Sequence, residues 1–176
     1  MFCMATIAGA SWPPAWLRAV VIGRNPKRTL GRIVILAVTC FVVFRYVLLG
    51  IRVEGASMLP TYRERGVHVV NRLAYLWSKP KRRDVVVIRL AGPSIMYMKR
   101  IIGLPGETVE FHQGKVLING EILDEPYLQL NSDWEWPPFT LGPDEYFVVG
   151  DNRSMAWEDH TKGKTTRNRI AGKILL

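Results

Sequence analysis

The chain has 176 residues, of which 48% are hydrophobic and 22% charged, and its formal net charge is +9. This balance predicts one packed domain with an appendage and excludes a generally disordered chain. The excess of basic residues suits an anionic partner, either nucleic acid or anionic lipid.

The cysteines and histidines predict neither a disulfide framework nor a metal site. Cys3 lies near the N-terminus and Cys40 lies inside an apolar run, so neither is placed to cross-link the polar part of the chain. The three histidines stand far apart, with no cysteine or carboxylate at a metal-ligand spacing: His68, His112 and His160. Histidine catalysis therefore has no evident orienting partner.

Residues 1–29 are expected to be a poorly ordered or membrane-surface tail, in which residues 15–22 form a short interfacial helix. Residues 30–51 are expected to form a transmembrane helix, because Ile33–Phe44 carries no charge and the apolar run approaches the roughly 20 residues that span a bilayer. Arg45 lies close enough to the end of the run to reach the interface. The alternatives are a buried core helix and a cleaved signal peptide, but the sequence after the run favours a retained anchor.

Basic residues on both sides of this helix bear on its orientation. Arg24, Lys27, Arg28 and Arg32 precede it and favour a cytoplasmic N-terminus. Arg52, Arg63 and Arg65 follow it and weaken the bias. Because large domains translocate regardless of their charge, residues 52–176 are still expected on the extracytoplasmic side.

From residue 52 onward, short β-like runs alternate with turn residues, and no amphipathic helix of ten or more residues stands out. The predicted fold is mainly β, an antiparallel domain behind one membrane helix. Two turn signals, His112-Gln113-Gly114 and Asn119-Gly120, predict hairpins. A loop rich in Trp, Pro and Asp is expected between Leu128 and Pro143. The expected strands are Val67–Val70, Asp84–Leu90, Tyr97–Ile102, Thr108–Phe111, Lys115–Ile118, Tyr146–Val149 and Arg169–Leu176.

Ser57 follows the apolar run in a turn of small residues that ends at Pro60, where it is either a nucleophile at a membrane surface or an ordinary turn hydroxyl. A serine nucleophile needs a base. Lys99 is the candidate because it lies among apolar neighbours, and burial lowers the pKa of an ammonium group. Strand alternation sends Lys99 and Arg100 to opposite faces, so one of them must point inward or along a groove. The alternative for Lys99 is a solvent-exposed place at a strand edge.

A third polar stretch, Gly150-Asp151-Asn152-Arg153-Ser154, follows the expected strand Tyr146–Val149. Gly-Asp-Asn after a strand is a turn signal. The closeness of Asp151 and Arg153 suggests a loop fixed by polar contacts, and an ordinary hairpin turn is the alternative.

These three stretches, in this order behind a membrane anchor, resemble the motifs of the type I signal peptidases (leader peptidases), a family of bacterial serine–lysine membrane endopeptidases. The serine motif is Gly55-Ala56-Ser57-Met58-Leu59-Pro60-Thr61 and the lysine motif is Lys99-Arg100-Ile101-Ile102-Gly103-Leu104-Pro105-Gly106-Glu107. The third is Gly150-Asp151-Asn152-Arg153. The resemblance covers residues 30–176, and the lysine motif is its most specific part.

The resemblance implies the family's β-rich catalytic core, with residues 107–145 as a variable second β region, and no metal or organic cofactor. Ser57 would be the nucleophile and Lys99 the general base. The backbone N–H of Ser57 would donate to the oxyanion, and Gly55 stands where some members carry a hydroxyl residue as the second donor. Met58 and Pro60 would shape the turn, and with Tyr97 they are the expected groove residues.

The partners implied are secretory preproteins, cut after a small-x-small pattern, and membrane lipids. The location implied is the plasma membrane, crossed once, with the catalytic domain on its extracytoplasmic face. Nucleic acid is not expected, because no aromatic-basic platform or recognition helix supports it.

After Arg153 the sequence departs from the family's pattern. Aligned without a gap, Ala156 stands where the family has the serine that hydrogen-bonds the lysine; with a one-residue insertion, Asp159 takes the place of the family's aspartate. Ser154 or a water is expected to substitute for the serine. The expected supporting loop comprises Asp151, Asn152, Arg153, Ser154 and Asp159. Two other functions remain open: a relative with one dedicated substrate, such as a pilin-maturing peptidase, and an inactive membrane-anchored binding paralogue.

Overall fold

The computed structural model describes residues 25–91, 95–130, 132–158, 160 and 162–175. It divides into two units, Met1–Val43 and Phe44–Leu176. In the first unit, helix α2 (Pro26–Val42) begins after Asn25 with a proline in its first turn, where a missing N–H costs no helical hydrogen bond. The expected helix at residues 15–22 lies outside the described residues.

The helical segment Lys27–Val47 is long and apolar enough to cross a membrane. It consists of α2 and a single π-helical stretch, Val43–Val47. Its large apolar side chains are exposed, among them Ile35, Phe41 and Phe44. The buried core helix, one alternative from the sequence, would hide these side chains, so their exposure argues against it.

The expected end of this helix was wrong, because the chain leaves the helix after Val47 and forms strand β1 (Leu48–Arg52). Strand β1 pairs antiparallel with β2 (Val67–Asn71). Within β1, Leu49 and Ile51 pack against a core cluster that includes Met58 and Val70. An extended chain places alternate residues on one face, so Leu49 and Ile51 reach this core together.

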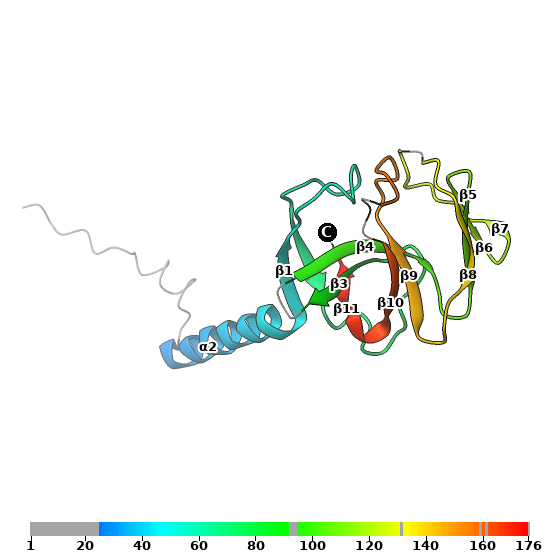
Figure 1. Cartoon of the computed structure of the whole chain (residues 1–176). Coiled ribbons are helices and arrows are strands. Elements are labelled where there is room, and N and C mark those ends of the chain that lie inside the picture. The colour runs from blue at the N-terminus through cyan, green and yellow to red at the C-terminus, as the bar shows by residue number, and fades with distance from the viewer. Residues whose placement is uncertain (1–24, 92–94, 131, 159, 161, 176) are drawn as a thin grey trace, which may run out of the picture. The chain divides into compact units, whose positions relative to one another are not determined.

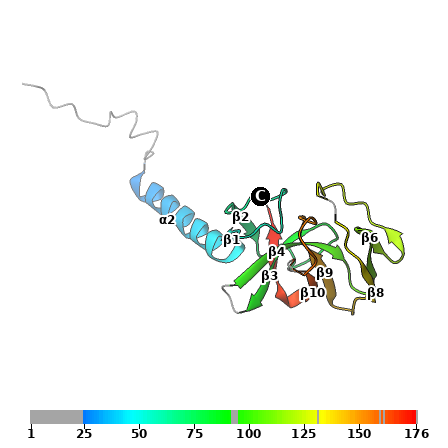
Figure 2. The same ribbon diagram turned by 45° about the horizontal axis from the view of Figure 1, so that its top comes forward.

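The second unit contains two antiparallel sheets, which confirms the predicted fold class (Figure 1). The order of the seven-stranded sheet is β1-β2-β11-β3-β4-β9-β10, and that of the four-stranded sheet is β7-β6-β5-β8. Both views show β6 and β8 beyond β9, on the side away from β1 (Figures 1 and 2). The further strands are β3 (Val85–Ala91), β4 (Ile95–Gly103), β5 (Thr108–His112), β6 (Lys115–Ile118), β7 (Glu121–Ile122), β8 (Trp136–Thr140), β9 (Glu145–Val149), β10 (Gly163–Thr166) and β11 (Ile170–Ile174).

Strand β3 is almost purely β-branched because both of its faces are buried. Val85 and Val87 join the cluster that contains Met58, whereas Val86 and Ile88 join a second cluster on the opposite face. A strand covered on both sides reads as a continuous apolar run rather than an alternating one. Strand β4, the next in the sheet, carries Lys99 directly opposite Val86 of β3.

A third cluster joins the two sheets, with Phe147 and Val149 from one and Val109 and Phe111 from the other. The two predicted hairpin turns are confirmed. Gln113 and Gly114 between β5 and β6, and Asn119 and Gly120 between β6 and β7, all have positive φ. Such pairs of positive φ values match the twist of a tight hairpin.

The long loop expected between Leu128 and Pro143 was wrong in part, because it contains strand β8. Pro137 and Pro138 lie in this strand and cannot donate to a ladder. Strand β8 is at the edge of its sheet, and among the described residues its one partner strand is β5, so the missing donors are tolerated.

Candidate active site

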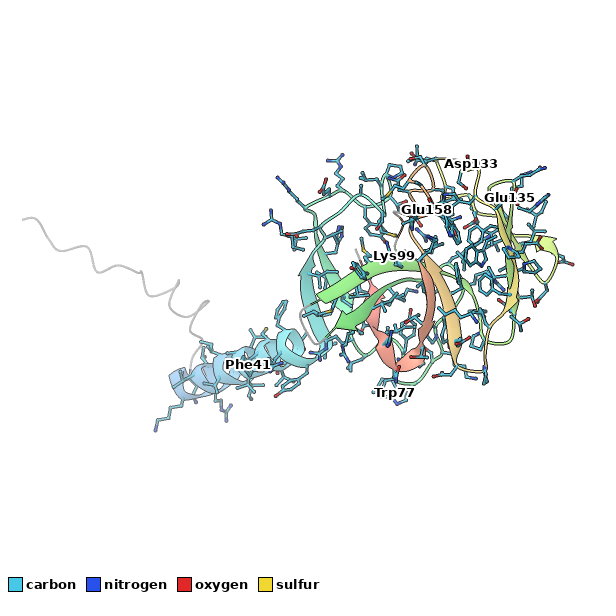
Figure 3. The ribbon with its side chains drawn as sticks, viewed as in Figure 1. Phe41, Trp77, Lys99, Asp133, Glu135 and Glu158 are labelled. Atoms are coloured by element: carbon cyan, nitrogen blue, oxygen red, sulfur yellow. The ribbon has the colours of Figure 1, made fainter. Side chains whose placement is uncertain are left out.

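Ser57 and Lys99 are 42 residues apart in sequence and meet in the second unit. Ser57 lies in the turn between β1 and β2, and Lys99 lies on β4. The Nζ atom of Lys99 is 2.5 Å from the Oγ atom of Ser57, which is hydrogen-bonding distance. Figure 3 shows Lys99 on β4 inside the β domain, well away from Trp77. When Lys99 is neutral, its nitrogen can accept the proton of this hydroxyl.

Lys99 is buried, with 2% of its surface exposed. Burial lowers its pKa from 10.5 to about 8, against the opposing effect of the negative charge on Asp151. The neighbouring Arg100 is also buried. Sequence alternation required only one of these two cations to point inward, and the structure buries both.

The Gly150–Asn152 loop holds the backbone of the serine turn. The Asn152 N–H donates to the Ser57 carbonyl at 3.0 Å, and its side-chain amide donates to the Ala56 carbonyl at 3.0 Å. Gly150 packs so closely that a Cβ atom there would lie 2.1 Å from the Ser57 carbonyl oxygen. The predicted polar loop therefore fixes the position of the serine turn.

Two buried ion pairs hold this loop in turn. Arg100 binds the carboxylate of Asp151 through two nitrogens, at 2.8 and 2.5 Å. Arg153, which is 1% exposed, binds Glu125 at 2.7 Å and donates to the Gly150 carbonyl at 2.8 Å. Both pairs satisfy guanidinium groups that would otherwise be costly to bury.

Sequence reasoning missed the contribution of the segment before β8. Glu125 is the carboxylate partner of Arg153, and the ring of Tyr127 lies 3.9 Å from the Arg100 guanidinium carbon. The Tyr127 hydroxyl donates to Glu125 at 2.6 Å. No local pattern marks these residues, because they lie in an irregular segment and their partners are distant in sequence.

A cavity of about 250 Å³ opens beside Ser57. Met58 and Tyr97, two of the three expected groove residues, line it, whereas Pro60 is exposed and is absent from its lining. The Leu59–Pro60 peptide bond is cis. The rest of the lining comes from two extended segments, Ile51–Glu54 and Met96–Met98, and from Val87.

Gly55 and Ser57, the two residues expected to form the oxyanion side of the site, lie on the same turn. Gly55 is exposed with φ of 101°, a conformation that favours glycine. Among the described residues, no hydrogen bond uses the Ser57 N–H.

Within the described residues, no group of three or more His, Cys, Asp or Glu side chains is arranged to hold a metal ion.

In the described part of the loop, the residues after Arg153 do not give Lys99 a second hydrogen-bond partner in addition to Ser57. Ser154 is exposed, and its hydroxyl donates to Asn152 Oδ1 at 2.7 Å rather than approaching Lys99. Ala156 is exposed as well. Asp159, the remaining residue expected in the supporting loop, lies outside the described residues.

Comparisons with known proteins agree on one family. Residues 27–176 match the family model described as signal peptidase, peptidase S26. A signal peptidase I from Leptolyngbya laminosa is 34% identical over 160 residues, covering 85% of this chain and 76% of the relative. A signal peptidase I from Bacillus caldolyticus is 32% identical over 180 residues, covering 94% of this chain and 88% of the relative. A solved signal peptidase I structure from Enterococcus faecalis is 30% identical, covers 55% of this chain and 97% of its own, and has a TM-score of 0.43.

Proposed function

Since the chain belongs to the signal peptidase family and is a peptidase, we propose that it removes N-terminal signal peptides from exported preproteins with Ser57 as nucleophile and Lys99 as general base. The observation that carries this proposal is the 2.5 Å contact between a buried Lys99 and Ser57. Two relatives named signal peptidase I, both matched over most of this chain, favour neither the dedicated-substrate alternative nor the inactive paralogue.

In the proposed reaction, neutral Lys99 takes the proton of Ser57 while Oγ attacks the carbonyl carbon of the scissile peptide. The oxyanion that forms accepts a hydrogen bond from the Ser57 N–H. Lys99 then gives its proton to the departing amine, which leaves an ester between Ser57 and the signal peptide. Lys99 next takes a proton from water, whose oxygen attacks the ester carbonyl, and returns it to Ser57.

The cavity beside Ser57 suits the peptide on the signal side of the scissile bond. Its two extended segments present backbone groups to which an extended peptide can add as a further strand. Met58, Val87 and Met98 give the cavity apolar walls, and Arg52 and Glu54 line it as well.

We further propose that the helical segment Lys27–Val47 anchors the enzyme in the plasma membrane. The basic residues before it would hold the N-terminus in the cytoplasm and leave the β domain on the extracytoplasmic side. Signal peptides emerge on that side, still held by the membrane, so an anchored peptidase meets them at high local concentration.

The test is cleavage of a purified preprotein in detergent by the full chain and by Ser57→Ala and Lys99→Ala. Each substitution should lower kcat/KM by roughly a thousandfold or more, because nucleophile and base act as a unit. Ser78→Ala and Lys79→Ala, at exposed positions outside the site, are the matched controls and should cleave like the parent. Cleavage that survives either dyad substitution would contradict the assignment, and a parent inert on all preproteins would contradict the function.

A further inference from the structure

His160 is the buried histidine of this chain. It is 2% exposed, whereas His68 is half-buried and His112 is exposed. A Cβ atom placed on Gly150 would lie 2.7 Å from His160 Cε1 and 2.8 Å from its Nε2, and it would lie 2.1 Å from the Ser57 carbonyl oxygen. The imidazole ring and the Ser57 carbonyl therefore share one face of Gly150 and border the same point.

Trp134 holds the imidazole ring in this place. The two rings meet edge to face, with centroids 4.9 Å apart and an interplanar angle of 75°. Trp134 is 4% exposed, its indole N–H donates to the Met155 carbonyl at 3.0 Å, and the Arg153 guanidinium carbon lies 5.7 Å from its ring centre. Because buried side chains pack with few voids, the imidazole ring has no room to move away from Gly150.

Hydrogen bonds fix the backbone of His160 as well. Its N–H donates to the Trp157 carbonyl at 3.4 Å. The ammonium group of Lys162 donates to the same carbonyl and also to the His160 carbonyl, the latter at 3.2 Å. The turn that carries His160 is thus closed from both sides, and the ring and the backbone each have a fixed position.

We propose that His160 is a positioning residue for Ser57: its imidazole ring walls in the Ser57 carbonyl and keeps the serine turn in place on the Gly150–Asn152 loop. This inference rests on the proposed function. The ring acts by its bulk, next to the hydrogen bonds that Asn152 donates to the turn. Removal of the ring opens a cavity beside the Ser57 carbonyl, and surrounding groups relax partly into such a space. Ser57 Oγ then leaves its 2.5 Å contact with Lys99.

The first arm of the test measures steady-state cleavage of a preprotein by the full chain in detergent. His160→Ala should lower kcat about tenfold and leave KM nearly unchanged, because a shift of a full 1 Å costs roughly a hundredfold. His160→Leu keeps the bulk of the ring without its nitrogens, so its kcat should stay within about threefold of the parent. His112→Ala, at a histidine whose side chain is 58% exposed, is the matched control and should cleave like the parent. A loss in His160→Leu as large as that in His160→Ala would overturn a role that depends on bulk.

The second arm combines His160→Ala with Gly150→Ala, because the methyl group added at Gly150 meets both the imidazole ring and the Ser57 carbonyl. Once the ring is gone, this methyl group can move into the vacated space and away from the carbonyl. The double variant should therefore cleave faster than Gly150→Ala alone, although each single change is harmful. Two losses that simply multiply would show that the sites are independent and would overturn the proposal.

The third arm needs no cleavage, so it separates this proposal from the proposed function. It follows hydrogen exchange at the Asn152 amide, which donates to the Ser57 carbonyl at 3.0 Å. In His160→Ala this amide should exchange about tenfold faster than in the parent. The Leu141 amide, which donates to the Glu107 carbonyl at 2.8 Å, should keep its rate. An unchanged rate at Asn152, or an equal acceleration at both amides, would overturn the proposal even if the parent cleaves preproteins. The expected pattern in a parent that cleaves none would retain the contact and reject the proposed function.

Discussion

At the scale of single residues, the chemistry depends on how completely Lys99 is removed from water. An exposed lysine is protonated at neutral pH and cannot accept a proton. The apolar faces around β4 exclude water from its side chain, and Asp151 is close enough to oppose the resulting change in pKa. Burial is therefore the larger of two opposing effects, and it sets the pH at which the base becomes available.

The pH dependence of cleavage follows from this balance. Because Lys99 acts only when neutral and its pKa is about 8, kcat/KM should rise roughly tenfold per pH unit below pH 8 and level off above it. Initial rates on a preprotein between pH 5.5 and 10, with a constant detergent and ionic strength, give the profile. A rate that stays flat from pH 6 to 10 would contradict a base of this pKa.

The same burial has a cost in stability, which predicts the effect of Lys99→Met. Lowering the pKa from 10.5 to about 8 means that the charged amine lowers the free energy of unfolding by roughly 3 kcal/mol. Lys99→Met should therefore raise the thermal midpoint at pH 7 while abolishing cleavage. Between about pH 8 and 10.5 the unfolded chain binds more protons than the folded one, so the parent should gain stability there and approach the variant. A variant less stable than the parent at pH 7 would contradict this account.

The close packing of Gly150 against the serine turn predicts that Gly150→Ala displaces Ser57 and lowers activity. In Gly150→Ala the new Cβ would meet the Ser57 carbonyl oxygen at 2.1 Å, so the serine turn must shift. A displacement of about 1 Å at a reacting atom costs roughly a hundredfold in rate, and kcat should fall by at least that factor. Gly50→Ala, where a Cβ meets nothing within 4 Å, is the matched control and should cleave normally. Near-parental activity in Gly150→Ala would show that the loop does not fix Ser57.

At the scale of secondary structure, the strands that sequence reasoning missed are all at sheet edges. Strands β1 and β10 end the seven-stranded sheet, and β8 ends the four-stranded sheet. An edge strand needs one partner only, so β8 tolerates prolines and β10 needs no apolar run. The central strand β3, covered on both faces, carries the clear β-branched signal that made it predictable.

The candidate site also contains residues that the sequence identified and residues that it missed. Ser57, Lys99 and the Gly150–Arg153 loop stand in short motifs, so the sequence was enough to single them out. Glu125 and Tyr127 reach the same loop only through tertiary packing, from a segment without a periodic pattern. Such partners are set by the fold rather than by local spacing, and no local signal announces them.

The pair Arg153–Glu125 gives a prediction about how the irregular segment before β8 supports the active site. Glu125→Gln keeps the shape of the side chain but leaves the charge of a buried Arg153 without a partner, which typically costs about 3–5 kcal/mol. The thermal midpoint should fall clearly, and kcat should fall by more than KM rises, since the loop positions Ser57 rather than binding substrate.

The neighbouring pair Arg83–Asp124 provides the control for this prediction. Asp124 is 82% exposed, so Asp124→Asn should change the free energy of unfolding by less than about 1 kcal/mol and leave cleavage unchanged. Unfolding in detergent, followed by circular dichroism, and steady-state kinetics measure both effects. Equal effects of Glu125→Gln and Asp124→Asn would contradict a structural role for the buried pair.

At the scale of the whole molecule, the sequence predicted a membrane span but misplaced its end. Composition alone does not separate the last apolar turn of a helix from the first strand of a β domain, because both are apolar. Leu48–Arg52 becomes β1 through pairing with β2 and contact with the core, both of which are tertiary effects. The helical segment that could cross a membrane consequently ends at Val47, and strand β1 follows it directly.

The orientation of the chain is the last prediction. Lys27, Arg28 and Arg32 stand at the start of the span and should keep this end in the cytoplasm, where basic flanks are retained. Single cysteines, Asn25→Cys on one side and Ser78→Cys on the other, are introduced in a background with Cys3→Ser and Cys40→Ser. Asn25 and Ser78 are both exposed residues. In intact cells a membrane-impermeant maleimide should label Ser78→Cys at once, and it should label Asn25→Cys only after permeabilisation. The reverse pattern would put the proposed catalytic domain in the cytoplasm, where signal peptides on translocated preproteins do not reach it.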